Sequence, residues 1–271
     1  MNNRIDGSNA RSPRLEGRVA LIVGGGTGIG EASARAFSRE GCSVAVADLR
    51  ADAARDVAAS IVAAGGNAFG FGIDVTSDDS VSETMACIVQ KFGKLDTLFN
   101  CAGGSLPLDA PVTDVDLSVW DLTMTLDVRG TMLACRHALP HIVNAGGGTV
   151  VNMSSGAALR GSSNAHVYTA AKGAILSLTR ALAGTYAKNN IRVNAICSGR
   201  INTERIRQTY GIPGKPGFAV DAMNIDQQIK TYPYWFGEPE DIAAIALFLS
   251  SIESRMITGA SIPADGGRSA Y

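Results

Sequence analysis

The sequence predicts a single α/β domain with a parallel, doubly wound sheet of about seven strands and helices on both faces. Two observations lead to this fold class. The chain has 271 residues, of which 46% are apolar, and a chain of this length buries a large core. Short apolar runs also alternate with longer amphipathic segments, which is typical of a parallel sheet between two layers of helices.

The predicted strands are short apolar runs with few polar interruptions, a pattern typical of strands buried on both faces. They are Val19–Val23, Ser43–Ala47, Ala68–Ile73, Thr97–Asn100, Thr149–Met153 and Arg192–Ile196. The predicted helices lie between and after these runs. They are Gly30–Glu40, Ala51–Ala64, Ser77–Phe92, Leu117–Asn144 and Val167–Lys188. This order of strands and helices predicts a Rossmann-type sheet.

Two segments fall outside this alternation. Residues 1–13 are polar and lack the apolar core of a signal sequence, so we expect a flexible tail before a single domain at residues 14–271. Residues 202–236 show no strand pattern and contain three prolines and six aromatic residues. A connection this long inside a compact domain is usually functional. We interpret it as a lid over an apolar ligand, and an oligomer contact surface is the alternative.

The charge and the cysteines exclude several classes of protein. The 24 Lys and Arg residues nearly balance the 25 Asp and Glu residues, so nucleic acid is not expected as a partner. No apolar run reaches the roughly 18 residues of a membrane helix, so no membrane partner is expected. The five cysteines form no C-x-x-C pair, and His137 and His141 lack an apparent third ligand. We therefore expect no disulfide framework, no metal site and a cytoplasmic location.

A glycine-rich turn joins the first predicted strand to the first predicted helix. Its sequence is Gly24-Gly25-Gly26-Thr27-Gly28-Ile29-Gly30. Glycines let the backbone approach a pyrophosphate, whose charge the N-terminus of the following helix stabilises. The strand before the turn and the helix after it form the context in which this motif binds a dinucleotide. We expect cofactor contacts from Gly24, Gly26, Thr27, Gly28, Ile29 and Gly30.

Asp48 ends the second predicted strand, 18 residues after Gly30. A carboxylate at this place accepts hydrogen bonds from the adenosine ribose and repels a 2′-phosphate, which favours NAD over NADP. Arg50 weakens this preference because it places a cation nearby. Asp74, after the third predicted strand, has two open interpretations: it caps the helix that starts near Ser77, or it contacts the adenine.

Tyr168 and Lys172 are four residues apart on a predicted helix, so their side chains share one face. The nearby ammonium favours the phenolate form that a general base needs. Ser154 and Ser155 follow the predicted strand before this helix, at the sheet edge where ligands bind in open α/β folds. A serine hydroxyl there is placed to bond a substrate oxygen. His166 is near Tyr168 along the chain, and both a substrate contact and a structural role are open.

In this order, these motifs resemble the classical short-chain dehydrogenase/reductase family, and the resemblance runs from Arg18 to Gly267. Further matching segments are Asn100-Cys101-Ala102-Gly103, Asn152-Met153-Ser154-Ser155, Arg192-Val193-Asn194-Ala195-Ile196 and Asp265-Gly266-Gly267. The resemblance implies an NAD-binding catalytic domain that transfers a hydride between the cofactor and an alcohol or ketone carbon. It also implies a homotetramer.

The resemblance assigns a role to each site residue. Ser155 corresponds to the catalytic serine and Tyr168 to the general acid/base. Lys172 corresponds to the lysine that supports this tyrosine and holds the nicotinamide ribose. Thr203 resembles the threonine that contacts the carboxamide. Further cofactor contacts are expected from Asp74, Val75, Cys101, Ala102, Gly103 and Ile201.

Asp127 is the departure from the family pattern with the largest expected consequence. It occupies the position of the family's fourth catalytic residue, an asparagine that acts largely through its backbone carbonyl. An aspartate keeps this carbonyl, but its carboxylate has two candidate partners, Lys172 and Arg129. Pairing with Lys172 weakens the effect of the lysine on Tyr168, so we expect reduced activity relative to an asparagine.

These observations predict a cytoplasmic NAD-dependent dehydrogenase or reductase of a fairly apolar secondary alcohol or its ketone. The apolar character is inferred from the aromatic residues in 202–236 and the lack of a clear cationic site there. One alternative is a 3-oxoacyl-[acyl-carrier-protein] reductase, which Asp48 disfavours because that activity usually uses NADP. Another is a non-catalytic NAD-binding regulatory protein, which the intact Ser155, Tyr168 and Lys172 disfavour.

Overall fold

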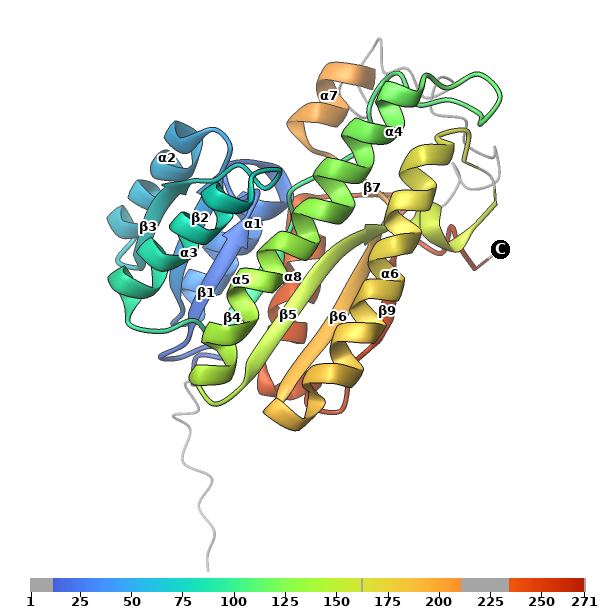
Figure 1. Ribbon diagram of the computed structural model, residues 1–271. Helices are drawn as coiled ribbons and strands as arrows, with labels where there is room; N and C mark the ends of the chain where they lie inside the picture. Colours follow the sequence, from blue (N-terminus) through green and yellow to red (C-terminus); the bar gives the residue numbers. More distant parts are fainter. Residues whose placement is uncertain (1–11, 162, 211–233, 271) are drawn as a thin grey trace, which may run out of the picture.

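The computed structural model describes residues 12–161, 163–210 and 234–270, which form a three-layer α/β fold (Figure 1). The central sheet has seven strands in the order β3-β2-β1-β4-β5-β6-β9, and all of them pair in parallel. The strands are β1 (Val19–Val23), β2 (Ser43–Asp48), β3 (Asn67–Gly72), β4 (Thr97–Asn100), β5 (Gly148–Ser155), β6 (Ile191–Ser198) and β9 (Ser261–Ala264). The winding reverses between β1 and β4, and the carboxyl ends of such strands are the usual ligand site.

Helices cover both faces of this sheet, which confirms the predicted fold class. One face is covered by α1 (Gly28–Arg39), α2 (Ala51–Ala63) and α8 (Pro239–Ser250). The other is covered by α3 (Asp78–Phe92), α5 (Gly130–Asn144) and α6 (His166–Tyr186). Successive residues of β1 alternate between the two cores, with Ala20 and Ile22 in the first and Leu21 and Val23 in the second. Burial on both faces explains why this strand is uninterrupted in hydrophobicity.

The predicted helix at residues 117–144 is confirmed as a continuous helical segment, but it is not α-helical throughout. The segment contains α4 (Leu117–Thr123), a π-helical stretch at Met124–Arg129, and then α5. A π-helical turn inserts extra backbone and is frequent at functional sites. Asp127 lies within this stretch and is fully buried. The wider turn therefore occurs where the buried carboxylate of Asp127 lies. Hydrophobic periodicity in the sequence predicts neither feature.

Two short strands and the last strand of the main sheet were missed by the sequence pattern. β7 (Arg200–Ile201) pairs with β8 (Phe236–Gly237), so the predicted absence of a strand in 202–236 is wrong at its end. β9 is an edge strand that is only partly buried and contains Pro263, which suits an edge position. None of these elements has the long apolar run that marks the other strands.

The predicted tail and lid fall largely on residues 1–11 and 211–233, which lie outside the described residues. Within the described part of 202–236, α7 (Glu204–Tyr210) follows β7. The tail and the lid therefore stay predictions. Of the helices formed by the described residues, none combines the length and the hydrophobicity needed to cross a membrane.

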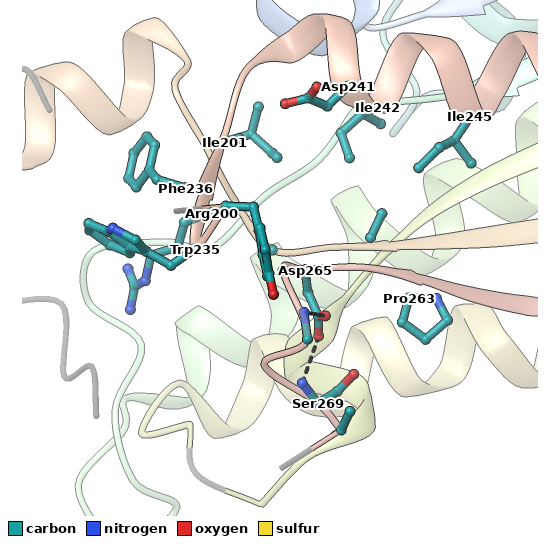
Figure 2. Close-up of a pocket in the computed structure, with 17 residues that line it drawn as sticks. Arg200, Ile201, Trp235, Phe236, Asp241, Ile242, Ile245, Pro263, Asp265 and Ser269 are labelled. Atoms are coloured by element: carbon teal, nitrogen blue, oxygen red, sulfur yellow. Dashed lines mark hydrogen bonds between the residues drawn. The ribbon is translucent and has the colours of Figure 1, made fainter. Parts of the chain in front are cut away.

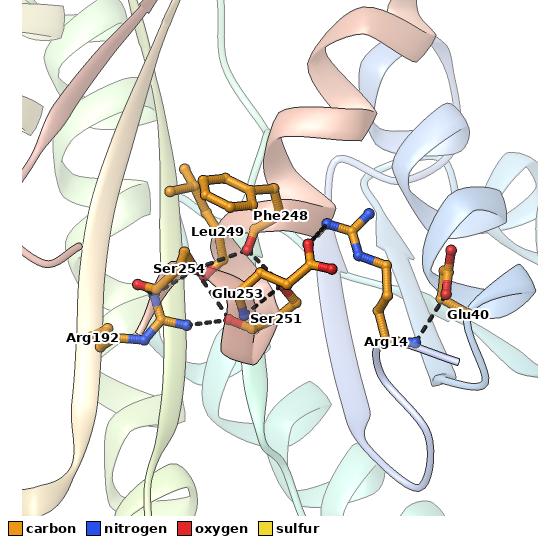
Figure 3. Close-up of polar contacts among 8 residues, drawn as sticks. All are labelled: Arg14, Glu40, Arg192, Phe248, Leu249, Ser251, Glu253 and Ser254. Atoms are coloured by element: carbon orange, nitrogen blue, oxygen red, sulfur yellow. Dashed lines mark hydrogen bonds and ion pairs between the residues drawn. The ribbon is translucent and has the colours of Figure 1, made fainter. Parts of the chain in front are cut away.

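Arg192 on β6 ties the sheet to the connection between α8 and β9 (Figure 3). Its Nη1 donates to the Ser254 backbone oxygen at 3.0 Å and to Ser254 Oγ at 2.8 Å, and its Nη2 donates to the Ser251 oxygen at 2.8 Å. On the other side of this connection, Arg14 forms an ion pair with Glu253. These bonds fix the chain that leads into β9 and thus the carboxyl end of the sheet.

Candidate active site

A groove of about 500 Å³ lies at the carboxyl ends of β1, β2 and β4. It brings together most of the predicted cofactor residues, from segments far apart in the chain. Those that line it are Gly24, Thr27, Gly28, Ile29, Asp48, Asp74, Val75, Cys101, Ala102, Gly103 and Thr203. Ile201 and Tyr168 instead line a neighbouring cavity of about 190 Å³, which shares Ile29, Thr203 and Arg205 with the groove.

The glycine loop requires glycine because its backbone packs against itself and against the next strand connection. A Cβ on Gly30 would lie 2.0 Å from the Gly24 carbonyl oxygen. Gly24 has a φ of +78°, and a Cβ there would lie 2.7 Å from the backbone nitrogen of Ala102. Both neighbours are backbone atoms and cannot rotate away. The loop is therefore held tightly against the connection after β4, and the start of α1 faces the groove.

Asp48 lies at the end of β2 beside this loop. Its Oδ2 accepts a hydrogen bond from the Gly26 N–H at 3.0 Å, and its Oδ1 accepts one from the Arg50 N–H at 3.0 Å. The side chain of Arg50 reaches Thr27, where its Nη2 lies 3.4 Å from the hydroxyl oxygen. The Asp48 carboxylate and the Arg50 guanidinium both border the groove. The group that disfavours a 2′-phosphate on the adenosine ribose therefore lies beside the cation that weakens this preference.

Asp74 does not cap α3, so that interpretation is wrong. The cap is Ser77, whose hydroxyl accepts a hydrogen bond from the Ser80 N–H. Asp74 instead accepts hydrogen bonds from the N–H and the hydroxyl of Thr76, which lower the pKa of its carboxyl group. The ionised carboxylate therefore faces the groove in a fixed turn.

Ser155 and Tyr168 meet at the 190 Å³ cavity, with Lys172 behind them. The Lys172 ammonium lies 5.5 Å from the centre of the Tyr168 ring and donates a hydrogen bond to the Met153 oxygen at 3.2 Å. Its side chain is 4% exposed. Ser154 is buried and donates to the Lys172 carbonyl oxygen, so Ser155 is the serine of the pair that borders the cavity.

Asp109 anchors the start of α6 and was missed by the sequence analysis. Its carboxylate accepts hydrogen bonds from the N–H groups of Val167, at 3.2 Å, and Tyr168, at 2.7 Å. It is 59 residues from Tyr168 in the chain, and no local pattern links the two. His166 Nδ1 accepts a hydrogen bond from the Val112 N–H at 3.0 Å, which gives this histidine a structural contact with the same loop.

Asp127 pairs with Lys172, which decides between the two partners considered from the sequence. Its Oδ2 lies 3.5 Å from the Lys172 ammonium, and its Oδ1 accepts a hydrogen bond from the Gly104 N–H at 2.9 Å. Arg129 instead donates to the Thr76 carbonyl oxygen. The Asp127 backbone carbonyl accepts a hydrogen bond from the Thr131 hydroxyl at 2.7 Å. Both oxygens of a buried carboxylate are thus directed toward the lysine and the loop after β4.

Cys101 lies where the loop after β4 meets the groove, and burial raises the pKa of its thiol to about 12. It is therefore a neutral thiol at physiological pH. Behind it, Asn100 donates to Asn152, and Asn152 donates to Thr179, so a buried chain of amides joins β4, β5 and α6. The described part of the chain contains no group of three or more His, Cys, Asp or Glu residues that could hold a metal ion.

A further cavity of about 550 Å³ lies between the end of β9 and the start of α8 (Figure 2). Its labelled apolar lining includes Trp235, Phe236, Ile242 and Ile245. Arg200 borders both this cavity and the one that holds Tyr168. The C-terminal segment thus shapes the region next to the catalytic side chains.

Comparisons with known proteins agree with this geometry. A family model described as "Enoyl-(Acyl carrier protein) reductase" matches residues 24–269. The chain is 39% identical to 2-(S)-hydroxypropyl-CoM dehydrogenase 3 of Xanthobacter autotrophicus, across 96% of this chain and 99% of that protein. It is 34% identical to meso-2,3-butanediol dehydrogenase of Serratia marcescens, across 95% and 96% of the two chains.

Among solved structures, the fold resembles a 7α-hydroxysteroid dehydrogenase complexed with NADH and 7-oxo glycochenodeoxycholic acid. The TM-score is 0.82, the sequence identity is 32%, and the match covers 95% of this chain and 96% of the other. The comparisons of sequence and of fold agree with each other. The chain belongs to the short-chain dehydrogenase/reductase family of oxidoreductases.

Proposed function

We propose that the protein interconverts a fairly apolar secondary alcohol and its ketone with NAD(H) as the cofactor. The observation that carries this proposal is the cavity where Ser155 and Tyr168 meet, next to a groove lined by the glycine loop. The buried ammonium of Lys172 lies behind Tyr168. A general acid/base, a hydrogen-bond donor and a dinucleotide groove are the parts that the interconversion of an alcohol and its ketone needs.

The groove fits a dinucleotide. The glycine loop brings backbone N–H groups and the start of α1 to the place where a pyrophosphate binds in such folds. Asp48 is placed to accept hydrogen bonds from the adenosine ribose and to disfavour a 2′-phosphate. When bound, NAD(H) supplies or accepts the hydride. We assign the cofactor contacts to Gly24, Gly26, Thr27, Gly28, Ile29, Gly30, Asp48, Asp74, Val75, Cys101, Ala102, Gly103, Tyr168, Lys172, Ile201 and Thr203.

The proton chemistry is assigned to three side chains. In the oxidation direction, the Tyr168 phenolic oxygen takes the proton of the substrate hydroxyl, and in reduction it returns a proton to the ketone oxygen. Ser155 Oγ donates a hydrogen bond that holds this substrate oxygen. The Lys172 ammonium stabilises the negative charge on the Tyr168 oxygen during the transfer. We further propose that Asp127 positions Lys172 and reduces its effect on Tyr168, because it offers the ammonium a second, negative neighbour.

The relatives support a secondary alcohol as the substrate class. The proteins named above are dehydrogenases of hydroxypropyl-CoM, of butanediol and of a hydroxysteroid. The family model is named for an enoyl-(acyl carrier protein) reductase. The two relatives, which match along almost their whole length, are instead named as dehydrogenases of alcohols. Neither the 3-oxoacyl alternative nor the regulatory alternative gains support from them.

The test is a panel of secondary alcohols and ketones, each assayed with NAD(H) and with NADP(H) by the absorbance of the reduced cofactor. The proposal expects turnover of at least one pair and a higher kcat/KM with NAD(H). Turnover with NADP(H) alone would contradict the role of Asp48, and binding of NADH without any turnover would favour the regulatory alternative.

We also propose that the protein acts in the cytoplasm as a homotetramer. The location is supported by five cysteines that are all free thiols. The tetramer rests on family membership. Light scattering coupled to gel filtration measures the mass of the assembly, and a monomeric mass that persists at high protein concentration would contradict this proposal.

A further inference from the structure

The first turn of α6 carries Tyr168 but has no cap of its own. The residue at its N-cap position is Ala165, whose side chain accepts no hydrogen bond. The first N–H groups of an α-helix have no partner within the helix, and an Asp, Asn, Ser or Thr side chain at the N-cap normally bonds the second or third residue. In α6 these residues are Val167 and Tyr168. The turn that holds Tyr168 therefore needs a partner from elsewhere in the chain.

Asp109, in the loop after β4, is that partner. Its two carboxylate oxygens accept hydrogen bonds from the Val167 N–H at 3.2 Å and from the Tyr168 N–H at 2.7 Å. A capping side chain at position 165 would bond the same N–H groups. The negative charge also stabilises the positive end of the helix dipole. Asp109 thus supplies the missing cap from a distant part of the sequence.

Further contacts hold the loop beside the helix start. The His166 N–H donates to the Ala110 oxygen at 3.4 Å, and the Val112 N–H donates to His166 Nδ1 at 3.0 Å. Both bonds lie within three residues of Asp109 along the loop. The carboxylate is therefore held in place opposite the first turn.

The first turn sets where Tyr168 lies relative to its two proposed partners in the reaction. Lys172 lies one turn further along α6, is 3% exposed and donates to the Met153 oxygen, so the sheet fixes it independently. Ser155 belongs to β5 and borders the same cavity as Tyr168. Asp109 is not among the described residues that line this cavity or the cofactor groove. Its effect on the reaction therefore passes through the backbone of Tyr168.

We propose that Asp109 is a positioning residue, which caps α6 from the loop after β4 and thereby keeps the Tyr168 oxygen within reach of Ser155 and Lys172. The proposal rests on the proposed function, because it concerns the proton transfer by Tyr168. A reacting group that is displaced by about 1 Å lowers the rate by up to about 100-fold. A frayed first turn displaces Tyr168 and leaves Ser155 and Lys172 in place.

The test is Asp109→Ala, with alcohol oxidation followed as a single turnover so that product release does not hide the chemical step. We expect the rate to fall by about tenfold and the NADH dissociation constant to change by less than about twofold. The rising limb of the pH–rate profile should move to higher pH, because the displaced phenolate loses support from Lys172. Loss of the Asp109 charge alone would move it to lower pH, so the direction identifies the displacement.

The other charged groups that line the Tyr168 cavity stay the same in every variant. They are Arg160, Arg200, Arg205, Asp265 and Arg268.

Two further variants restore the cap in different ways. Asp109→Asn removes the charge but keeps a carbonyl acceptor, and asparagine caps helices about as well as aspartate. Adding Ala165→Asp to Asp109→Ala places a carboxylate at the N-cap itself, where it reaches the same two N–H groups. We expect both to keep a single-turnover rate within about threefold of the wild type, with the pH–rate profile no longer moved to higher pH.

Asp116→Ala is the matched control. Asp116 is the N-cap of α4, where its Oδ1 accepts a hydrogen bond from the Ser118 N–H at 2.8 Å. It removes the same kind of cap from a helix that carries none of the proposed catalytic residues. We expect a lower melting temperature with an unchanged rate and pH–rate profile.

Each outcome decides the proposal. A wild-type rate and profile in Asp109→Ala would overturn it, as would an equal loss of rate in Asp116→Ala. If Ala165→Asp restores the melting temperature without the rate, Asp109 does not act as a cap. If it restores neither, Asp109→Asn decides: a rate near that of the wild type supports the proposal, and a rate as low as that of Asp109→Ala overturns it.

If the wild-type protein oxidises no alcohol, the proposed function fails, and the ultraviolet titration of the Tyr168 phenol then decides this proposal. The Tyr168 signal is obtained by difference from Tyr168→Phe. Titration at higher pH in Asp109→Ala, reversed by Ala165→Asp, supports the positioning role. An unchanged titration overturns it.

Discussion

The two halves of the active site are built in different ways. In the cofactor half, backbone lies against backbone, and a Cβ on Gly30 would lie 2.0 Å from the Gly24 oxygen. In the catalytic half, side chains from separate elements meet: Lys172 on α6 lies 3.5 Å from Asp127 in the π-helical stretch. The first half depends on the absence of side chains over a few consecutive residues. The second depends on charges that the fold brings together.

This difference predicts how each half fails. A substitution in the cofactor half is expected to harm binding and folding through steric conflict. A substitution in the catalytic half is expected to harm turnover, and it affects stability only where it leaves a buried charge without its partner.

The largest separable effect is expected for Lys172→Met. Turnover should fall by about 10²–10³-fold because Tyr168 loses its cation. Stability should fall by roughly 3 kcal/mol because the buried carboxylate of Asp127 loses its counter-charge. Denaturant titration and steady-state kinetics measure the two quantities.

Adding Asp127→Asn to Lys172→Met tests the coupling between them. The double variant should regain most of the lost stability and none of the turnover. A double variant as unstable as Lys172→Met would show that the Asp127–Lys172 pair is not what holds this region together.

In the cofactor half, Gly30→Ala should weaken NADH binding by roughly 100-fold or more and lower the free energy of unfolding by about 3 kcal/mol, through overpacking. Gly184→Ala is the matched control, because a Cβ at Gly184 in α6 meets nothing within 4 Å. It should stabilise the protein by about 0.5–1 kcal/mol. Calorimetry measures the stability of the two variants, and NADH fluorescence measures their affinity for the cofactor. Normal NADH affinity in Gly30→Ala would remove the steric basis of the comparison.

A smaller effect is expected for Asp48→Asn, which keeps the shape of the side chain and removes its charge. The ratio of kcat/KM for NADH over NADPH should fall by about tenfold, because the variant no longer repels a 2′-phosphate and Arg50 remains beside it. The affinities for both cofactors, measured by fluorescence, show whether binding accounts for the change. An unchanged ratio would mean that Asp48 serves the loop through Gly26 and does not select the cofactor.

The smallest effect is expected for Asp127→Asn alone. It removes a negative charge 3.5 Å from the Lys172 ammonium and keeps the backbone carbonyl. We expect kcat to rise by about two- to fivefold and the rising limb of the pH–rate profile to move to lower pH, since the phenolate form gains support. If the profile does not move, the carboxylate is not coupled to Tyr168.

The same division explains what the sequence could and could not predict. The glycine loop, Asp48 and the Tyr168–Lys172 pair are local patterns, and the family prediction based on them is confirmed. The anchor at Asp109 depends on a contact 59 residues away in the chain, which local patterns do not contain. Asp127 is fully buried within a π-helical stretch, and hydrophobic periodicity predicts neither the stretch nor the buried carboxylate.

The central claim is that Tyr168 exchanges the proton of the substrate oxygen while the cofactor half binds NADH independently. Tyr168→Phe tests it directly, with turnover and NADH affinity measured on the same preparation. The account predicts that turnover falls by about 10³-fold while the NADH dissociation constant changes by less than about twofold. Turnover close to that of the wild type would contradict the assigned chemistry, and a parallel loss of NADH binding would contradict the independence of the two halves.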